Sequence, residues 1–405
     1  MRAWLLGVLI LAGLSLGATR PDAVAAEASS EVPSVRGMTI STRTSGHEWG
    51  TADFPAELDR LQALGVNWIA IHPYAGVRAD GELRWRSWEG DAGPDYLAKA
   101  IDAAHARGMQ ILVKPHIAYW GSPFAWRGDI RFDDPKHTAR FWADLSRWTV
   151  ALARASRRAD GFSVGCELRH FEADEARWRA LIAEVRVALA GQAVGDDAAG
   201  PAAGGAPGDH GARKVESGRS PSAGGVFTGQ DAPDGLAATS VAGQGSAPRT
   251  PQLTYAANWD SVLDVPFWDA LDSIGVQAYY PLEVETAPGE LPTEAQLRAA
   301  WTPHLVDLMQ LSMRTGKPVV FLELGYDRNV SAHLEPWVGA REAPTEATTE
   351  LQRRLFAAAL DVLHRERKWL RGAFLWKWFV EPTRREDFTL DHPAVRDLLK
   401  ERWAE

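Results

Sequence analysis

The sequence is poor in cysteine. Cys166 is the only one among 405 residues, so the chain cannot form an internal disulfide. It also has no cluster of cysteine and histidine at the spacing of a metal site, and no His-x-His pair after the first predicted strand. We therefore expect neither a metal nor another cofactor.

Clustered basic residues are absent too. The net charge is −9, and the 44 lysines and arginines are not gathered into one stretch. Nucleic-acid binding needs a concentrated basic face, so we expect no nucleic-acid partner. We expect the partner to be an uncharged molecule. We also expect the protein to be a monomer.

A run long enough to span a membrane is missing at the amino terminus. The apolar residues Trp4 to Leu16 fall short of the roughly 20 that a transmembrane helix needs. They follow a single charge at Arg2 and precede the small residues Ala23 to Ala26, which is the order found in secretory signal peptides. We predict a signal peptide at residues 1–26, a secreted or periplasmic protein, and no membrane attachment after cleavage.

Aromatic and branched apolar residues nearly disappear between Gly191 and Thr250. Ala, Gly, Pro, Ser and Asp dominate this stretch, and such a composition cannot bury enough apolar surface to offset chain entropy. We predict a disordered, low-complexity insertion at residues 191–250. A boundary between two domains is the alternative, although the segment lies between a helix and a strand of one repeating pattern.

The rest of the chain alternates short apolar strands with amphipathic helices. The predicted strands are Val35–Ile40, Val66–Ile71, Met109–Val113, Asp160–Glu167, Gln252–Asn258, Ser273–Tyr279, Lys317–Glu323 and Gly372–Trp378. The predicted helices are Phe54–Leu64, Pro94–Arg107, Asp134–Arg157, Ala173–Ala190, Pro266–Leu271, Thr293–Thr315, Glu346–Lys368 and Pro393–Trp403. Eight such pairs predict the α/β class, as a single-domain (β/α)8 TIM barrel at residues 33–405.

Two of the predicted strands end in glutamate, at Glu167 and Glu323. The carboxyl ends of all barrel strands meet at one mouth, where the chemistry of such folds lies. Retaining glycosidases use two carboxyl groups about 5–5.5 Å apart, and inverting enzymes hold theirs farther apart. A structural ion pair at the rim is the alternative for either glutamate alone. We predict that the pair is catalytic, one as an acid with a raised pKa and the other as an ionised nucleophile.

Other strand ends carry candidates for sugar binding. Tyr279 or Tyr280 can donate to Glu323, and we favour Tyr280. Trp376 and Trp378 share one face of the eighth strand by alternation, so one indole can lie beneath the sugar whose bond is cleaved, with core packing as the alternative. Polar side chains that end strands two, three and five complete the set: His72, Tyr74, Lys114, His116 and Asn258. Loop tryptophans on the same side can line a cleft: Trp85, Trp88, Trp120 and Trp126.

Five strand-end motifs together resemble glycoside hydrolase family 113. They are Gly165-Cys-Glu-Leu168, Tyr255-Ala-Ala-Asn-Trp259, Gly275-Val-Gln-Ala-Tyr-Tyr-Pro-Leu282, Phe321-Leu-Glu-Leu-Gly-Tyr326 and Phe374-Leu-Trp-Lys-Trp378. The resemblance runs from Val35 to about Trp403 outside the insertion. That family contains β-1,4-mannanases and belongs to a clan of retaining barrels. Much of the clan has Asn before the acid/base, whereas Cys166 stands there here, as in family 113 itself.

The resemblance implies that Glu167 is the acid/base and Glu323 the nucleophile, acting on a β-linked neutral polysaccharide or oligosaccharide of the β-1,4-mannan type. Three alternatives stay open. One is a metal-dependent barrel hydrolase that uses strand-end histidines. Another is a carbohydrate-binding barrel without turnover. The third is transglycosylation by the same two acids.

Overall fold

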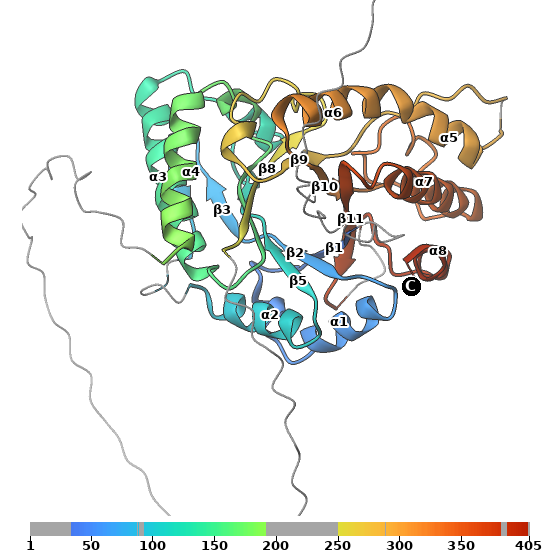
Figure 1. Ribbon diagram of the computed structural model, residues 1–405, viewed down its shortest axis with the longest axis horizontal. Coiled ribbons are helices and arrows are strands. Elements are labelled where there is room, and N and C mark those ends of the chain that lie inside the picture. Colours follow the sequence, from blue (N-terminus) through green and yellow to red (C-terminus); the bar gives the residue numbers. More distant parts are fainter. Residues whose placement is uncertain are drawn as a thin grey trace, which may run out of the picture.

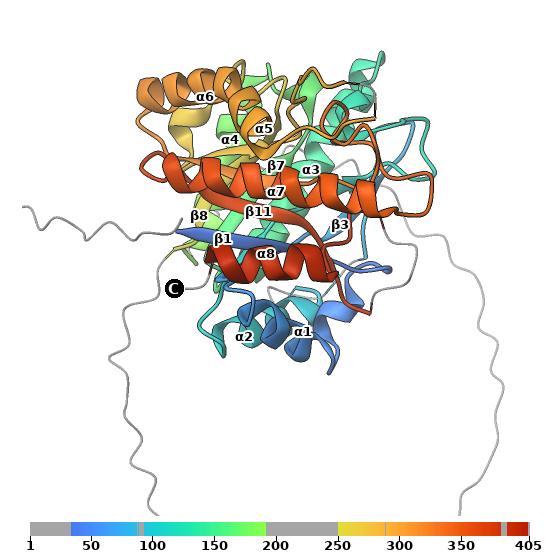
Figure 2. The same ribbon diagram turned by 90° about the vertical axis from the view of Figure 1, so that its right-hand side faces the viewer.

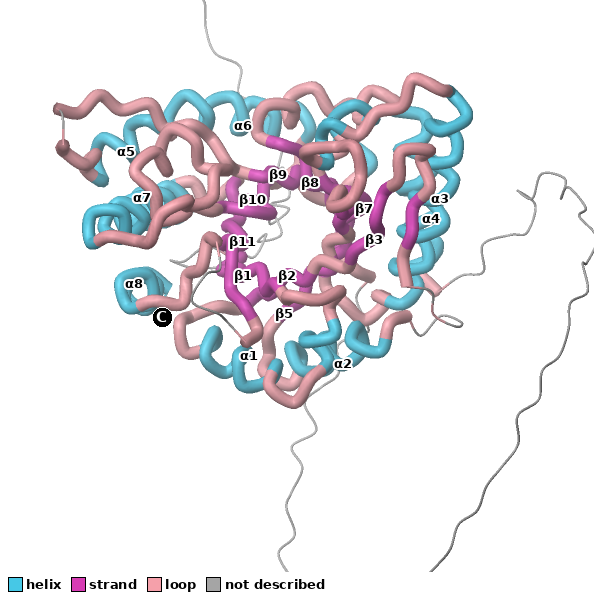
Figure 3. The backbone as a smooth tube through the Cα atoms, turned by 180° about the vertical axis from the view of Figure 1, so that it is seen from behind, coloured by secondary structure: helices cyan, strands magenta, loops and turns pink. Residues whose placement is uncertain are grey.

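The computed structural model describes residues 34–86, 88, 93–191, 250–287, 289–381 and 387–403. Eight parallel strands close into a barrel in the order β1, β11, β10, β9, β8, β7, β5, β2. Figure 3 shows this ring of strands with the helices around it. The strands are β1 Val35–Ser41, β2 Trp68–Ile71, β5 Gln110–Val113, β7 Gly161–Cys166, β8 Gln252–Asn258, β9 Ile274–Gln277, β10 Val319–Leu324 and β11 Leu370–Phe379. The predicted (β/α)8 barrel is confirmed.

Helices cover the outside of the barrel, as Figures 1 and 2 show. They are α1 Phe54–Gln62, α2 Asp95–His105, α3 Pro135–Ala155, α4 Glu175–Leu189, α5 Glu294–Ala300, α6 Thr302–Thr315, α7 Glu346–Arg365 and α8 Pro393–Trp403. Local sequence explains where several begin. The Asp134 carboxylate accepts from the Lys136 N–H at the start of α3, and Thr345 and Thr348 form a capping box at the start of α7.

Two predicted helices differ from the structure. The single helix expected over residues 293–315 is divided at Trp301 into α5 and α6. Pro303 explains the division, because it has no N–H to donate to the carbonyl four residues earlier and its ring clashes with that carbonyl. The helix expected over residues 266–271 is only a 3-10 turn, Trp268–Ala270.

The core has two parts, one inside the barrel and one between the strands and the helices. Inside the barrel, the buried side chains come from six strands: Ala70, Leu112, Cys166, Ala256, Val320, Leu322 and Phe374. The larger part lies outside the ring and includes most of the buried tryptophans. Strand residues next to one another therefore alternate between two apolar environments, which explains why the strands read as nearly continuous apolar runs.

A small second sheet beside the barrel was missed by the sequence patterns. It orders three short strands as β4 (Leu83–Arg84), β3 (Tyr74–Val77) and β6 (His116–Ala118). β3 and β6 follow β2 and β5 after only a few residues. Strands of two to four residues give too short an apolar pattern to be recognised. The sheet extends the wall of the barrel mouth past His72 and Lys114.

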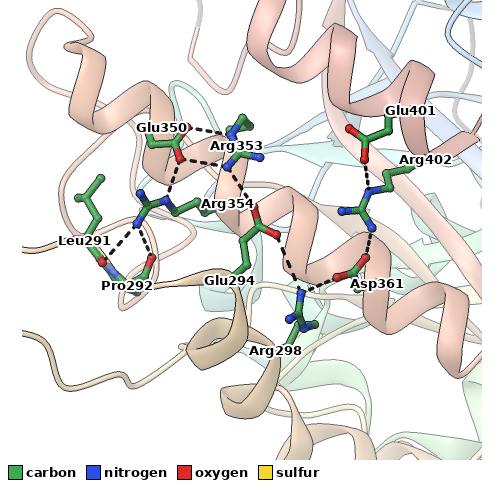
Figure 4. Close-up of polar contacts among 10 residues, drawn as sticks. All are labelled: Leu291, Pro292, Glu294, Arg298, Glu350, Arg353, Arg354, Asp361, Glu401 and Arg402. Atoms are coloured by element: carbon green, nitrogen blue, oxygen red, sulfur yellow. Dashed lines mark hydrogen bonds and ion pairs between the residues drawn. The ribbon is translucent and has the colours of Figure 1, made fainter.

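Charged side chains tie together the helices that follow the last strands. Arg298 on α5 and Arg402 on α8 both contact Asp361 on α7, and Arg353 on α7 reaches Glu294 on α5 at 3.0 Å. Figure 4 shows this network. The five charged side chains named here are only partly exposed, and a network holds its side chains at a lower entropic cost than isolated surface pairs. It keeps α5, α7 and α8 together on one side of the barrel.

Two of our expectations concern residues outside the described ranges. The predicted signal peptide, residues 1–26, lies entirely outside them, and so does the predicted insertion apart from its ends at Gly191 and Thr250. Within the described part of the chain, no helix combines the length and apolar character needed to cross a membrane.

Candidate active site

Glu167 reaches the barrel mouth at a break in the regular backbone of β7. Cys166 lies inside the barrel, so simple alternation would turn the next side chain outward. Glu167 instead takes a left-handed conformation with φ 53°, and its N–H donates to the carbonyl of Ala256 at 2.8 Å. A non-glycine residue in this region costs roughly 1–2 kcal/mol. The strain is located at the residue whose orientation the site requires.

Glu323 is turned into the mouth by an irregularity in β10. The register between β10 and β9 shifts between Phe321 and Glu323. Phe321 packs outside the ring against Trp301, whereas Leu322 and Glu323 both face inward. An extra residue in one strand re-aims the side chains that follow it, and such bulges are frequent next to active sites.

Glu323 is held as an anion. Lys114 Nζ lies 2.5 Å from its Oε1, and the Tyr279 hydroxyl donates to its Oε2 at 2.8 Å. Burial acts to raise the pKa of Glu323, but the attraction of Lys114 outweighs it, and the pKa lies below its usual value. The charge and both hydrogen bonds favour the form that a nucleophile needs.

Glu167 has the opposite balance. It is buried, and its Oε2 receives a hydrogen bond from Arg127 Nη1 at 2.5 Å. Burial raises the pKa of Glu167, Arg127 opposes the rise, and the negative charge of Glu323 adds to it. The net shift is upward, so a proton is retained to a higher pH than on an ordinary glutamate. That is the requirement for a general acid.

The thiol of Cys166 lies close to both carboxylates. Its Sγ lies 3.9 Å from Glu167 Oε2 and within 4.8 Å of a carboxylate oxygen of Glu323. These distances keep the acids inside the roughly 9.5 Å of the widest glycosidase pairs. Gln277 Nε2 donates to the same sulfur at 3.5 Å. The arrangement suits two acids acting on one bond.

The choice of Tyr280 as the donor to Glu323 was wrong. Tyr279 is the donor, and the Tyr280 ring stacks on His304 with 4.5 Å between ring centroids and packs against Trp301. The reason is that side chains continue to alternate between two faces after the end of β9. Gln277 faces the barrel interior, so Tyr279, two residues later, points the same way and Tyr280 points toward the helices.

Trp376 and Trp378 do not share one face of β11. Trp376 lies over the site, with its ring centroid 5.6 Å from that of His72 and from Lys114 Nζ. Trp378 is buried outside the ring, where its indole N–H donates to Glu57 at 2.8 Å. The register of β11 against β1 shifts between Thr39 and Ile40, and this irregularity reverses the facing of Trp378. Trp378 therefore packs in the core and is not a site residue.

The strand-end histidines lie beside the acids. His72 and His116 stack with 5.0 Å between ring centroids, and Tyr74 packs against both. Burial, together with the positive charges of Lys114 and Arg127, lowers the pKa of each imidazole well below its usual value, so both rings are neutral. His72 Nδ1 and His116 Nε2 are buried without a hydrogen-bond partner. Such unsatisfied groups can bind sugar hydroxyls.

Asn258 lies at the rim of the mouth. It is buried at the end of β8, and its side-chain amide donates to Asp260 Oδ1 at 2.7 Å. Its role in substrate binding stays a prediction.

Sequence reasoning missed Arg127 and Gln277. Arg127 belongs to a 3-10 turn, Arg127–Asp129, in the loop after β6. Besides contacting Glu167, it donates to the carbonyl of Ile117 and to His116 Nδ1. Nothing in the sequence distinguishes this arginine from the others. Gln277 is a polar residue at the end of the apolar strand β9, and Glu323 has a similar position near the end of β10. The same pattern could therefore have identified Gln277 as a site residue.

The cluster does not suit a metal ion. His116, Cys166 and Glu323 place one potential ligand atom each within 4.8 Å of one another. Arg127 Nη2 donates to His116 Nδ1 at 3.3 Å, so a neutral ring carries its proton on Nε2. Metal binding needs that nitrogen free of its proton. Lys114 and Arg127 also bring two positive charges to the same space.

Comparison with known proteins identifies this arrangement. The sequence pattern of Glycoside Hydrolase Family 113 matches residues 38–197 and 250–392. This chain is a member of glycoside hydrolase family 113. It is therefore a glycosidase, as its motifs predicted. The family match skips residues 198–249, which fall within the predicted insertion.

Solved structures of family 113 have a similar fold. A β-mannanase of this family from Alicyclobacillus acidocaldarius, in complex with ManMIm, matches with a TM-score of 0.64 at 21% identity, over 91% of this chain and 97% of that one. A second, described as a β-1,4-mannanase, matches with a TM-score of 0.65 at 17% identity, over 91% and 98% of the two chains. No curated protein matched by sequence.

Proposed function

We propose that this family 113 enzyme hydrolyses β-1,4-mannan-type chains with retention of configuration, with Glu323 as the nucleophile and Glu167 as the acid/base. The observation that carries the proposal is the contrast between the two carboxyl groups. Glu323 accepts hydrogen bonds from Lys114 and Tyr279, while burial and the neighbouring charge of Glu323 raise the pKa of Glu167. Two roles are thereby assigned to two chemically identical side chains.

In the first step, Glu323 attacks the anomeric carbon as the bond to the leaving oxygen breaks, and the proton of Glu167 passes to that oxygen. The products are a glycosyl ester on Glu323 and an ionised Glu167. In the second step, Glu167 takes a proton from water, the resulting hydroxide oxygen attacks the anomeric carbon, and Glu323 leaves as a carboxylate. Both residues return to their starting forms.

The exchange of roles follows from the coupling between the two acids. The charge of Glu323 contributes to the raised pKa of Glu167, and that charge disappears when the ester forms. The pKa of Glu167 then falls, and the acid of the first step becomes a suitable base for the second. We expect a bell-shaped profile of kcat/KM against pH. Its acidic limb reports protonation of Glu323, and its alkaline limb reports ionisation of Glu167.

A mannan-type substrate is supported by two kinds of observation. The family 113 structures with a similar fold are described as β-mannanases. In this chain, the half-buried indole of Trp376 and the unpaired nitrogens of His72 and His116 present an aromatic face and hydrogen-bonding groups beside the acids. These features suit a neutral sugar ring.

The test is covalent labelling with 2-deoxy-2-fluoro glycosyl fluorides of β-mannose, β-glucose and β-xylose, followed by peptide mass spectrometry. We expect the fluoromannoside to label Glu323 fastest and the Glu323→Gln variant to remain unlabelled. Labelling at Glu167, or fastest labelling by another sugar, would contradict the assignment of roles or of substrate. Hydrolysis that is abolished by a chelator, with no label from any sugar, would favour a metal-dependent hydrolase.

We also propose that residues 1–26 are a signal peptide and that the enzyme acts outside the cytoplasm. The support is the order of Arg2, the apolar run and the small residues before position 27. Amino-terminal sequencing of the protein recovered from its native host tests this. A mature chain that still begins at Met1 would contradict it.

A further inference from the structure

The backbone at Glu167 is anchored to the neighbouring strand β8 at two successive N–H groups. Glu167 has the left-handed conformation, and its own N–H donates to the carbonyl of Ala256 at 2.8 Å. The next N–H, that of Leu168, donates to the hydroxyl of Tyr255 at 2.9 Å. The two acceptors belong to adjacent residues of β8. The strained residue is therefore held by one backbone contact and one side-chain contact to the same strand.

The Tyr255 hydroxyl is oriented by Glu172. Tyr255 donates its proton to Glu172 Oε1 at 2.8 Å. A tyrosine hydroxyl has one proton to donate, so its bond to Glu172 leaves the acceptor side of the oxygen for the Leu168 N–H. Both side chains are buried. Loss of either hydrogen bond would leave a buried polar group unpaired, which is unfavourable.

The ring of Tyr255 is fixed by packing. Trp178 on α4 lies edge-on to it, with 5.0 Å between ring centroids, and the Trp178 indole N–H donates to the carbonyl of Phe171 at 2.9 Å. Gly165 lies against both rings, because a Cβ at this position would be only 2.8 Å from Trp178 and 3.0 Å from Tyr255. The position of the hydroxyl is therefore determined by the packed layer between the strands and the helices.

Tyr255 lies on the face of β8 that points away from the barrel interior. It belongs to the part of the core outside the ring, whereas Ala256 faces the inside. The carboxyl group of Glu167 is contacted by Arg127 instead. The Tyr255 hydroxyl can therefore affect the acid through the backbone of Leu168, but not through contact with a sugar in the mouth.

We propose that Tyr255 is a positioning residue for the acid/base: by binding the Leu168 N–H, it keeps Glu167 in the left-handed conformation that turns its carboxyl group into the mouth. Glu172 completes the arrangement by accepting the Tyr255 proton. The inference rests on the proposed function, since it concerns the residue to which the acid/base role is assigned. Without the hydroxyl, the left-handed conformation loses one of its two anchors, and Glu167 can relax toward an extended backbone that turns its side chain outward.

The test uses leaving groups that differ in their need for a proton. Phenolate leaves slowly unless its oxygen is protonated, whereas 2,4-dinitrophenolate leaves without a proton. We compare kcat/KM for phenyl and 2,4-dinitrophenyl β-mannobiosides, which share the same sugar part. We expect Tyr255→Phe to lower the value for the phenyl substrate about 10- to 100-fold and that for the dinitrophenyl substrate less than about 3-fold, because a misplaced acid forfeits part of its catalysis.

Two further measurements separate a misplaced acid from general damage. Labelling of Glu323 by 2-deoxy-2-fluoro-β-mannosyl fluoride releases fluoride, so it should proceed in Tyr255→Phe at nearly the wild-type rate. Azide attacks the glycosyl ester without giving up a proton, so it needs no base. Added azide should therefore raise kcat of Tyr255→Phe on the dinitrophenyl substrate and yield β-mannobiosyl azide. A variant with a damaged pocket would show neither behaviour.

Glu172 supplies a conservative variant and a disruptive one. Glu172→Gln keeps an oxygen that accepts from Tyr255, so both rates should stay within about 3-fold of wild type. Glu172→Leu has no acceptor and should show the leaving-group dependence of Tyr255→Phe, which also provides the comparison if Tyr255→Phe does not fold. Tyr280→Phe removes the hydroxyl of another buried ring and is the matched control that should change neither rate.

The Glu167→Ala variant distinguishes failure of this inference from failure of the proposed function. If Glu167 is the acid/base, Glu167→Ala should lose activity mainly on the phenyl substrate. Equal losses on both substrates would contradict the role of Glu167, and the inference with it. A strong leaving-group dependence in Glu167→Ala, together with equal losses or no loss in Tyr255→Phe, would overturn the inference and leave the proposed function intact.

Discussion

At the scale of single residues, the site depends on which of two adjacent side chains faces the barrel mouth. Tyr279 donates to Glu323 while Tyr280 packs against the helices. The two residues are adjacent in the chain and have the same type of side chain. This contrast provides a matched pair for experiment.

We expect Tyr279→Phe to lower kcat/KM roughly tenfold to a hundredfold, because a hydrogen bond to a buried charge contributes about 1.5–3 kcal/mol. The acidic limb of the pH profile should move to higher pH, since Glu323 loses a donor that stabilises its anion. Tyr280→Phe should leave both quantities near the wild-type values. The measurement is initial-rate kinetics from pH 4 to 9, and equal effects of the two substitutions would contradict the assignment.

Glu172 is a buried carboxyl group outside the proposed catalytic pair. The Tyr255 hydroxyl donates to it at 2.8 Å and accepts from the Leu168 N–H at 2.9 Å. This chain of contacts holds the residue that follows the left-handed turn at Glu167. Burial raises the pKa of Glu172 from 4.5 to about 7, and the hydrogen bond from Tyr255 only partly opposes the rise. The other charged groups near it are Asp260 and Arg169.

A raised pKa in the folded state means that folding favours the protonated form of Glu172. Its contribution to stability is therefore complete below about pH 4.5 and is lost as the pH rises through about 7. Glu172→Gln removes this dependence. We expect the variant to gain on the order of 3 kcal/mol relative to wild type between pH 4.5 and pH 8.

Chemical denaturation at these two pH values measures the difference. Glu184→Gln, at an exposed position on α4, is the control and should show no comparable gain. A wild-type stability that is equally high at both pH values would refute the expectation for Glu172.

At the scale of elements, sequence patterns located the barrel strands but not their irregularities. Apolar runs between helices placed all eight strands, because each strand is buried on both faces. The orientation of Glu167, Glu323 and Trp378 depends on a left-handed residue and on two register shifts. A prediction that assumes strict alternation of side chains between the two faces of a strand cannot include these features. The contribution of Arg127 was also invisible, because it depends on how a loop folds over the mouth.

The two tryptophans of β11 should respond differently to truncation. Trp376→Ala should lower kcat/KM roughly tenfold through loss of its aromatic face, with little change in stability, because the ring is only half-buried. Trp378→Ala should cost about 3–5 kcal/mol of unfolding free energy, because the ring is fully buried and its N–H is bonded to Glu57.

Urea denaturation and kinetics on the folded fraction separate these effects. A stable but inactive Trp378→Ala variant would contradict the placement of Trp378 in the core.

At the scale of the whole molecule, the barrel supplies the scaffold and the predicted insertion lies outside its repeating pattern. The family match skips residues 198–249, and the composition of this stretch cannot form a core. We propose that the barrel folds without it, as one domain.

Replacing residues 192–249 with a six-residue Gly/Ser linker tests that proposal. We expect kcat/KM to be unchanged and the stability to be equal or greater by up to about 2 kcal/mol, since a shorter loop has a smaller closure entropy. Thermal denaturation and kinetics measure both quantities. Loss of folding would show that the segment contributes to the domain.

The pairing of each acid with its own cation has a consequence for the whole reaction cycle. In the proposed mechanism, negative charge departs from Glu323, next to Lys114, and arrives on Glu167, next to Arg127. The net charge of the buried centre is the same before and after the covalent intermediate forms. The low-dielectric interior therefore never has to absorb a newly created ion, and each of the two half-reactions begins with a positive partner already in place for the carboxylate it uses.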